Sequence, residues 1–265
     1  MTARIRLAGS GQDAVIEPAE VGEGHVLILD GAEQSHVDLA DPSAIRHEYL
    51  RRVANVVDSL PAGPLRVLHL GAGALTLVRY VQALRPGSEQ TVVELEAELV
   101  GWVLQHLPLP AGTRLTAVAD DALAIVHQLE ASSFDCVVVD IFTDTGPTDL
   151  GAPQFYTALL KLLTDRGVAI VNIGDSPGLQ LFSRHAALME GAAETAGMGG
   201  VWTLTDASML AGNRPGNLML AAGPGLSPAA GMDVSAEAQR WRAAGPHPSA
   251  VLDPDGTAEL VQRFA

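Results

Sequence analysis

The sequence predicts an α/β fold in which helices cover both faces of a mostly parallel sheet. From residue 65 onward, short apolar segments alternate with segments of helical periodicity. Segments such as 134–140 (FDCVVVD) are nearly continuous in apolar residues. This is typical of strands that are covered on both sides. The first such segment is followed by a turn with two glycines, Gly71 and Gly73, and then by a helix, as expected of a βα unit.

The alternation predicts the elements of this sheet in order. We expect strands at residues 65–70, 90–94, 114–118, 134–140 and 167–173, with helices between them at about 75–84, 96–106, 121–129 and 153–164. Right-handed crossovers between these units give a doubly wound sheet. A helix at about 178–196 precedes strands near 200–205 and 217–222. A turn at residues 213–216 would join those two strands as an antiparallel edge, an arrangement found in Rossmann-like methyltransferase-type folds rather than in dehydrogenases.

A small antiparallel sheet is expected before this unit. Residues 14–17 and 25–30 read as strands, and the turn signal Asp30-Gly31 predicts a return through 33–37. Asp41 is the expected N-cap of a helix that runs to about residue 60.

Changes in composition divide the chain into three parts. We expect a β-hairpin segment over residues 1–40, a Rossmann-like catalytic domain over 41–223 and a C-terminal tail over 224–265. The tail begins with a linker rich in proline and glycine, and it is expected to hold two short helices, at 236–243 and 257–264.

The charge of the chain narrows the class of its ligands. Its 265 residues carry a formal net charge of −15 and a single lysine, Lys161. This argues against a nucleic-acid partner, because phosphate backbones are bound by clustered Lys and Arg. An acidic surface attracts cationic ligands such as amines. The alternative explanation is solubility or a high-salt habitat.

Other compositional features predict a protein without membrane segments or metal. The sequence has no apolar run of about eighteen residues, and its first residues do not resemble a secretory signal. The single cysteine, Cys136, excludes an internal disulfide and lies among apolar residues, which fits a cytoplasmic location. The histidines show no metal-ligand spacing, so we expect no metal.

The glycine turn predicts a nucleotide-type site. Gly71 and Gly73 follow a strand and precede a helix, and Glu94 ends the next strand. In such folds the helix N-terminus and the glycine backbone approach the ligand, and the acid binds the ribose hydroxyls. The alternative is a tight βα turn without a ligand.

Acidic residues lie at the carboxyl ends of four expected strands. They are Glu94, Asp120 with Asp121, Asp140 and Asp175. Since ligands of parallel sheets bind beyond these strand ends, we expect the acids to face one crevice. A single acid in this position is often a helix N-cap, and Asp121 could be only that.

Four blocks of the sequence resemble the spermidine synthase (polyamine aminopropyltransferase) family. They are LILDGAEQ at 27–34, VLHLGAG at 67–73, VVELE at 92–96 and FDCVVVD at 134–140. The resemblance extends over about residues 10–222, and the first block is the most discriminating because ordinary methyltransferases lack it. The resemblance implies a Rossmann-like, S-adenosylmethionine-dependent methyltransferase-type fold with a small N-terminal β-segment.

The same resemblance implies an activity and a donor site. The family transfers an aminopropyl group from decarboxylated S-adenosylmethionine to an amine such as putrescine. By position, Gln34 would contact the donor, Glu94 its ribose and Asp120 its adenine. The two glycines and Asp121 complete the cofactor-binding set that we expect.

On the acceptor side, the resemblance implies that Asp140 orients the amine and accepts its proton. His47 and Glu48 match a His-Glu pair of the family, and Asp144 replaces a second acid of its Asp140 loop with a shift of one residue. We expect these three residues to bind the substrate. Family members are commonly dimers or larger homo-oligomers.

Departures from the family pattern leave two alternatives open. The family has an acid directly after the glycine turn, where this chain has Ala74 and Leu75, and a tyrosine where it has Arg46. The first alternative is a methyltransferase that uses intact S-adenosylmethionine. The second is a non-catalytic homologue that binds adenosyl ligands.

Overall fold

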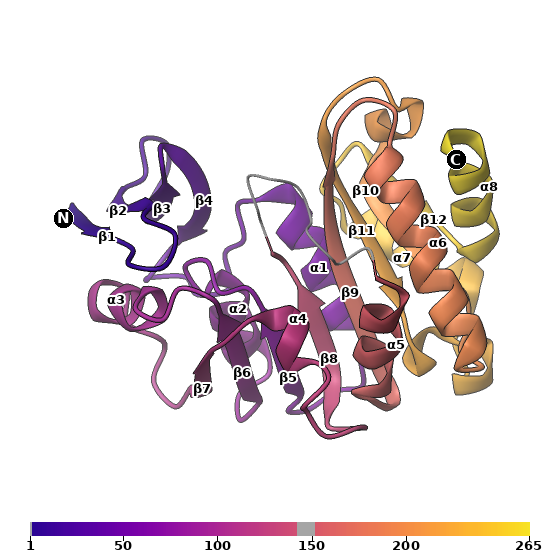
Figure 1. Cartoon of the computed structure of the whole chain (residues 1–265), viewed down its shortest axis with the longest axis horizontal. Helices are drawn as coiled ribbons and strands as arrows, with labels where there is room; N and C mark the ends of the chain where they lie inside the picture. Colours follow the sequence, from indigo (N-terminus) through magenta and orange to yellow (C-terminus); the bar gives the residue numbers. More distant parts are fainter. Residues whose placement is uncertain (1, 142–151) are drawn as a thin grey trace.

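The computed structural model describes residues 2–141 and 152–265, which form a small sheet and a large one (Figure 1). The small sheet consists of β1 (Ala3–Arg6), β2 (Asp13–Pro18), β3 (His25–Leu29) and β4 (Ala32–Val37), paired antiparallel in chain order. The large sheet has the order β12 (Ser249–Leu252), β10 (Trp202–Asp206), β11 (Gly216–Ala222), β9 (Leu163–Asp175), β8 (Phe134–Val139), β5 (Arg66–Leu70), β6 (Glu89–Glu94) and β7 (Arg114–Ala119).

Strands β5 to β9 pair in parallel. Beyond β9 each further strand is antiparallel to its neighbour: β11 to β9, β10 to β11 and β12 to β10. The predicted antiparallel edge is therefore confirmed. Among the described residues the structure contains two strands that the sequence did not predict, β1 and β12. Both have only four residues. Strand β12 lies in the predicted tail between two prolines, and its two buried apolar residues, Ala250 and Val251, are too few to form a recognisable strand pattern.

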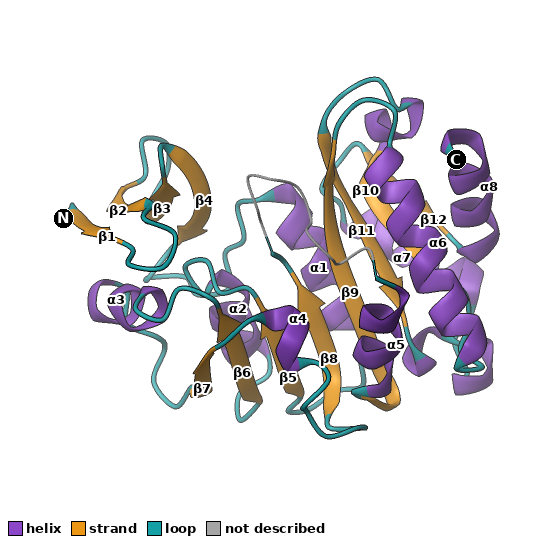
Figure 2. Cartoon of the chain, in the orientation of Figure 1, coloured by secondary structure: helices purple, strands orange, loops and turns teal. Residues whose placement is uncertain are grey.

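Helices cover both faces of the large sheet (Figure 2). One face packs against α1 (Glu48–Ser59), α2 (Thr76–Leu84), α3 (Leu99–His106) and α7 (Val234–Ala244). The other face packs against α4 (Ala122–Ile125), α5 (Pro153–Lys161), α6 (Gln180–Thr195) and α8 (Pro254–Phe264). Short 3-10 helices occur at Ala207–Ala211, Pro224–Leu226 and Pro228–Ala230.

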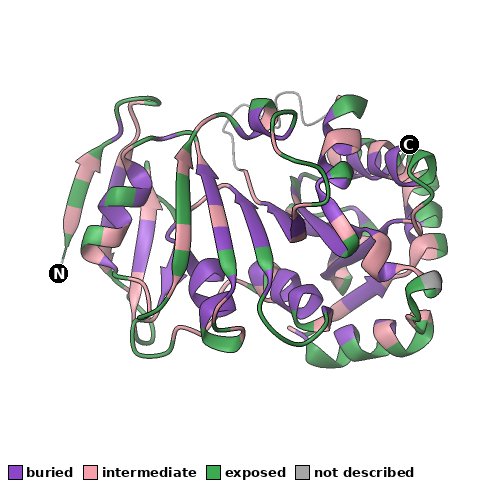
Figure 3. Ribbon diagram, turned by 90° about the horizontal axis from the view of Figure 1, so that it is seen from below, coloured by how far each residue is buried: buried purple, intermediate pink, exposed green. Residues whose placement is uncertain are grey.

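Alternate residues of each central strand enter opposite halves of the core. On β8, Val138 packs toward α1 and α2, while Val137 and Val139 pack toward α5 and α6. All of them are buried, and Figure 3 shows the central strands buried along most of their length. This two-sided burial explains why the strands read as continuous apolar runs rather than as alternating ones.

The helix predicted to begin at Asp41 begins later. Asp41 instead closes a turn, in which its Oδ1 accepts hydrogen bonds from the backbone N and the hydroxyl of Ser43. Helix α1 starts at Glu48, after an extended His47. An aspartate that bonds two residues ahead competes with the helix, so this N-cap prediction is wrong.

The strand order places a switch point at β5. The chain continues from β5 to β6 and β7 on one side, and then crosses from β7 to β8 on the other side of β5. Crevices for ligands in such sheets form beyond the carboxyl ends of the strands at this point. The small N-terminal sheet lies at the same end of β5 and β6, next to α2 and α3 (Figure 1).

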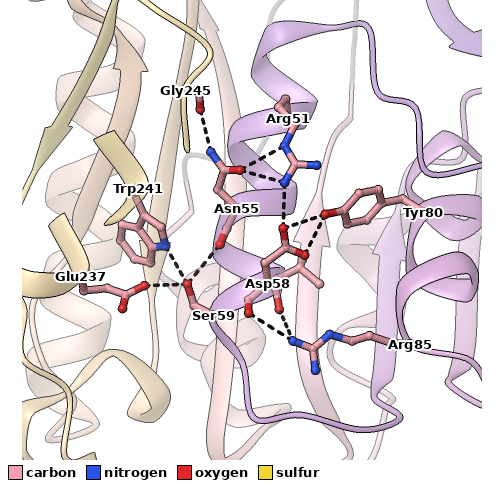
Figure 4. A network of polar contacts seen from close by, with 10 residues as sticks. Arg51, Asn55, Asp58, Ser59, Tyr80, Arg85, Glu237, Trp241 and Gly245 are labelled. Atoms are coloured by element: carbon pink, nitrogen blue, oxygen red, sulfur yellow. Dashed lines mark hydrogen bonds and ion pairs between the residues drawn. The ribbon is translucent and has the colours of Figure 1, made fainter. Parts of the chain in front are cut away.

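A network of polar contacts fixes the second half of α1 (Figure 4). The Asp58 carboxylate accepts hydrogen bonds from the Tyr80 hydroxyl of α2 at 2.7 and 2.8 Å and from Arg51 at 2.7 Å. The Ser59 hydroxyl joins Glu237 and the Trp241 indole of α7, both at 2.6 Å. Helix α1 is therefore tied to a helix on each side, which sets the direction in which its N-terminal end points.

Among the described residues, no helix combines the length and the hydrophobicity that a membrane crossing requires.

We expect Asp58→Asn to lower the free energy of unfolding by about 1 kcal/mol, because the amide cannot accept from Arg51 and Tyr80 as the carboxylate does. The partial exposure of Asp58 keeps the effect small by screening. Urea denaturation measures it, with the exposed Asp165→Asn as the matched control. Equal midpoints for the two variants would contradict the anchoring role of Asp58.

Candidate functional site

The turn after β5 makes two unusually close approaches. Gly71 has φ +97°, and a Cβ there would overlap the carbonyl oxygen of Asp140. Gly73 has φ +48°, and its Cβ would lie 2.5 Å from the Ser35 hydroxyl. Glycine adopts such backbone angles without strain. Protein packing alone therefore accounts for both glycines, and they bring the end of β8 and strand β4 against the turn.

Strand β4 is bonded directly to this turn and to the helix after it. The Ser35 hydroxyl accepts from the N–H of Ala74 at 3.0 Å, and the Thr76 hydroxyl donates to the carbonyl of His36 at 2.9 Å. Gln34, the neighbour of Ser35 on the strand, is half-buried. The contacts place the LILDGAEQ block beside the glycine turn, although the two are far apart in sequence.

The N-terminal segment is held in place by two acids of the loop after β6. Glu96 accepts hydrogen bonds from the backbone N–H groups of Gly9 at 3.2 Å and Ser10 at 2.6 Å. Glu98 accepts from the N–H of Ala8 at 2.6 Å. Main-chain donors thus dock the small sheet onto the end of β6.

Glu94 and the Asp120 pair lie together beyond β6 and β7. Glu94 accepts from the N–H groups of Ala72 at 3.0 Å and Glu96 at 3.1 Å, one on each carboxylate oxygen. The N–H of Asp120 donates to the carbonyl of Glu94 at 3.2 Å. Asp121 is exposed and caps α4 by accepting from the N–H of Leu123 at 2.9 Å. This agrees with the alternative in which Asp121 is a helix N-cap.

Asp140 leaves the end of β8 on the α1 side of the sheet and carries one hydrogen-bond donor on each oxygen. The Tyr49 hydroxyl donates to Oδ2 at 3.0 Å, and the Asn172 amide donates to Oδ1 at 2.8 Å. Burial raises the pKa of Asp140, and Asn172, Tyr49 and the nearby His47 oppose that rise. Burial, the charge of Asp140 and the hydrogen bond to it raise the pKa of Tyr49, so its hydroxyl stays a donor.

His47 and Glu48 stand at the start of α1 but point to different partners. The His47 ring lies 5.9 Å from the Tyr49 ring, and its Nε2 is 3.5 Å from a carboxylate oxygen of Glu33. Burial lowers the pKa of His47, and the charge of Glu33 opposes this effect. Glu48 is exposed and lies 3.6 Å from Arg52, so its carboxylate is paired within α1.

Asp175, another predicted acid, bonds the backbone at the start of α6. Asp175 accepts from the N–H groups of Ser176 and Phe182 at 2.7 Å each, so its carboxylate shapes the start of α6. The expectation that all four strand-end acids face one crevice is wrong for this residue. Asp144 lies outside the described residues.

A surface groove lies elsewhere, along α5. Thr157, Lys161 and His127 line it, and none of the predicted site residues does. Within residues 2–141 and 152–265, no group of three or more His, Cys, Asp or Glu side chains is arranged to hold a metal ion.

Residues 44–191, more than half of the chain, match the family model of the spermine/spermidine synthase domain. The chain belongs to this family. The polyamine aminopropyltransferase of Erwinia tasmaniensis is 30% identical over 170 residues, which are 62% of this chain and 56% of that protein. The polyamine aminopropyltransferase of Aeropyrum pernix is 29% identical over 157 residues, 56% and 48% of the two chains. The chain thus spans about half the length of the curated relatives it matches.

Solved structures agree with the fold of this family. A probable spermidine synthase from Corynebacterium glutamicum is 25% identical, with a TM-score of 0.82 over 100% of this chain and 95% of that one. The spermidine synthase of Thermotoga maritima, at 16% identity, has a TM-score of 0.55 over 100% and 83%. The predicted methyltransferase-type fold with a small N-terminal sheet is therefore confirmed.

One departure of this spermidine synthase family member from the expected pattern is Arg46. Arg46 stands where the family has a tyrosine, and it donates instead to the carbonyl of Val21 at 2.7 Å. Tyr49, three residues later, reaches Asp140. Sequence reasoning did not single out Tyr49 as a site residue. Its place within three residues of the His-Glu pair was the available signal.

A second departure from the expected family pattern lies directly after the glycine turn. Leu75 adopts φ +62° directly before α2 and is 1% exposed, packed with the N-terminal sheet and α3. An apolar side chain therefore fills the position next to the turn where the family has an acid. Asn172, which sequence reasoning also missed, is a polar residue near the end of an apolar strand, and that interruption was its signal.

We expect Gly71→Ala to destabilise the fold far more than Gly22→Ala. Both glycines have positive φ, but a Cβ at Gly22 meets nothing within 4 Å. The shared backbone strain is about 1–2 kcal/mol, and the overlap with Asp140 adds at least about 2 kcal/mol. Thermal and urea unfolding of both variants measure the difference. If both lose the same stability, the close approach of β8 to the turn has no energetic weight.

Proposed function

We propose that this protein transfers an aminopropyl group from decarboxylated S-adenosylmethionine to a small amine such as putrescine. The observation that carries the proposal is the Asp140 carboxylate, which lies at the switch-point end of β8 with one donor on each oxygen. Each oxygen has a second acceptor position, so an incoming amine has a place to bind. Membership of the spermine/spermidine synthase family supports this reaction class.

We assign the donor to the crevice around the glycine turn. Glu94 would accept from the ribose hydroxyls, because each of its oxygens keeps a free acceptor position beside the bond to Ala72 or Glu96. Asp120, held next to Glu94, would bind the adenine amine, with Asp121 at the outer edge. Gln34 would approach the donor from β4, and Gly71 and Gly73 would line its path.

The acceptor would enter between Asp140 and the start of α1. His47, which pairs with Glu33, lies beside Tyr49 on this side, and the negative charge of Glu33 would attract a cationic amine. Glu48 stays a prediction as a substrate ligand, since its carboxylate pairs with Arg52. Asp144 stays a prediction as a further substrate ligand.

In the proposed reaction the amine nitrogen attacks the carbon next to the sulfonium, and the carbon–sulfur bond breaks. The electron pair of that bond goes to sulfur and leaves neutral methylthioadenosine. Asp140 takes the proton that the nitrogen gives up, since a protonated amine is not a nucleophile. The sulfonium is already a good leaving group, so the chain contributes mainly by holding the two substrates in line and by excluding water.

A methyltransferase that uses intact S-adenosylmethionine is the second candidate. Buried Leu75 favours it, because no acid stands next to the glycine turn to hold the terminal amine of the decarboxylated donor.

We further propose a cytoplasmic homodimer or larger homo-oligomer, in line with the family resemblance. The proposed site uses no metal.

Calorimetry separates the candidates. We expect decarboxylated S-adenosylmethionine to bind at least about tenfold more tightly than the intact form, with putrescine binding after it. Preference for the intact donor would support the methyltransferase. No binding of either donor or of methylthioadenosine would reject both enzymes.

We expect Asp140→Asn to abolish turnover while donor affinity stays within a few-fold, because the amide has the same shape but accepts no proton. Product formation by mass spectrometry and donor titration measure the two effects. Asp165→Asn, at the opposite end of β9 from Asp175, is the control and should retain full turnover. Normal turnover in Asp140→Asn removes the residue from the mechanism.

A further inference from the structure

Asn172 is placed opposite Asp140 by the register of two strands. Val139 of β8 pairs with Val171 of β9, so the next residue of each strand is Asp140 and Asn172. Both valines pack toward α5 and α6. Since side chains alternate along a strand, Asp140 and Asn172 both turn to the other face, where the N-terminal end of α1 brings in Tyr49.

Only the nitrogen of the Asn172 side-chain amide makes a hydrogen bond within the described residues. Its Nδ2 donates to Asp140 at 2.8 Å, while its Oδ1 is buried and has no hydrogen-bond partner among residues 2–141 and 152–265. A buried acceptor without a partner is unfavourable by about 1–3 kcal/mol. The reversed amide would set Oδ1 against a carboxylate oxygen, which is less favourable still, so an ionised Asp140 determines how Asn172 points.

Within residues 2–141 and 152–265, few other titratable groups act on this carboxylate. From the start of α1, Tyr49 donates to it and His47 faces it, and His47 in turn lies beside Glu33 of β4. Strand β9 presents Asn172, and the turn after β5 presents the backbone of Gly71. Among the groups that oppose the effect of burial on the pKa of Asp140, Asn172 ranks first.

We propose that Asn172 is a positioning residue that selects the ionised form of Asp140 and thereby sets the lower pH limit of the transfer reaction. The inference rests on the proposed function, in which Asp140 must be ionised to take a proton. A donor fixed on Oδ1 favours the carboxylate over the acid, because the acid would leave Asn172 facing a weaker acceptor or a second donor. Asn172 also turns the carboxylate so that its free acceptor positions face the crevice.

The test is Asn172→Leu, which keeps the approximate volume and removes the donor together with the orphaned oxygen. Without this donor the pKa of Asp140 rises, so less of it is ionised at a given pH below that value. A rise of one unit makes turnover fall about tenfold at pH values well below the pKa, with recovery at higher pH. The acid limb of the pH profile of kcat/KM should move to higher pH. Folding stability should change little, because a buried unpaired acceptor is removed along with one hydrogen bond.

Two further variants make the result decisive. Asn217→Ala, on the neighbouring strand β11, is the control and should leave the acid limb where it is. Asn172→Asp sets a second carboxyl against Asp140, and the two would share a proton, so its acid limb should move further than that of Asn172→Leu. This second variant serves if Asn172→Leu does not fold. An equal loss of turnover at every pH, with an unmoved acid limb, overturns the proposal.

A direct titration keeps this inference separable from the reaction itself. Carbon-13 NMR of the labelled Asp140 carboxyl reports its pKa in the wild type and in Asn172→Leu without any substrate. An upward shift in the variant supports the role of Asn172 even if the wild type transfers no aminopropyl group. Unchanged titration in the variant rejects that role even if the wild type is active.

Discussion

Main-chain contacts at the turn after β5 are what the rest of the site depends on. The Gly71 N–H donates to the carbonyl of Val93, and the Asp140 N–H donates to the carbonyl of Leu70, both at 2.9 Å. The sheet ladder therefore continues beyond the strands and holds the ends of β6, β5 and β8 side by side. With a side chain at Gly71, β8 would have to withdraw, and Glu94 and Asp140 would no longer emerge on opposite sides of one turn.

The pKa of Asp140 depends on two opposing effects. Burial favours the neutral acid, whereas donors from β9 and α1 favour the carboxylate. The donors come from separate parts of the fold. Asn172 is set by strand register, and Tyr49 is set by the direction of α1, which contacts with α2 and α7 fix at its far end (Figure 4). The surroundings of the Asp140 carboxylate thus depend on the strand register, on α1 and on the helices that anchor α1.

The parts of the structure that depend on local patterns were predictable. Apolar runs and glycine turns predicted the five parallel strands, and a turn signal predicted the antiparallel edge. Strand ends then located Glu94, Asp120 and Asp140. Contacts between distant segments were not predictable from local patterns. Tyr49 lies 91 residues from Asp140 in sequence, and its helical spacing from the apolar residues of α1 also suits a core position. The prediction for Asp175 failed because an acid that bonds nearby backbone looks like an acid that awaits a ligand. The N-cap prediction for Asp41 failed because an aspartate that closes a turn has the same sequence pattern as one that caps a helix.

The small N-terminal sheet is docked through its backbone rather than through its side chains. Glu96 and Glu98 hold residues 8–10 through backbone N–H groups, which every residue except proline supplies. These contacts do not involve the side chains of residues 8 and 10. Gly9 is the exception, because a Cβ added there would lie 2.9 Å from the Glu96 carboxylate. Most substitutions at Ala8 and Ser10, proline excepted, would therefore leave the donors in place, and the small sheet would keep its position against β6.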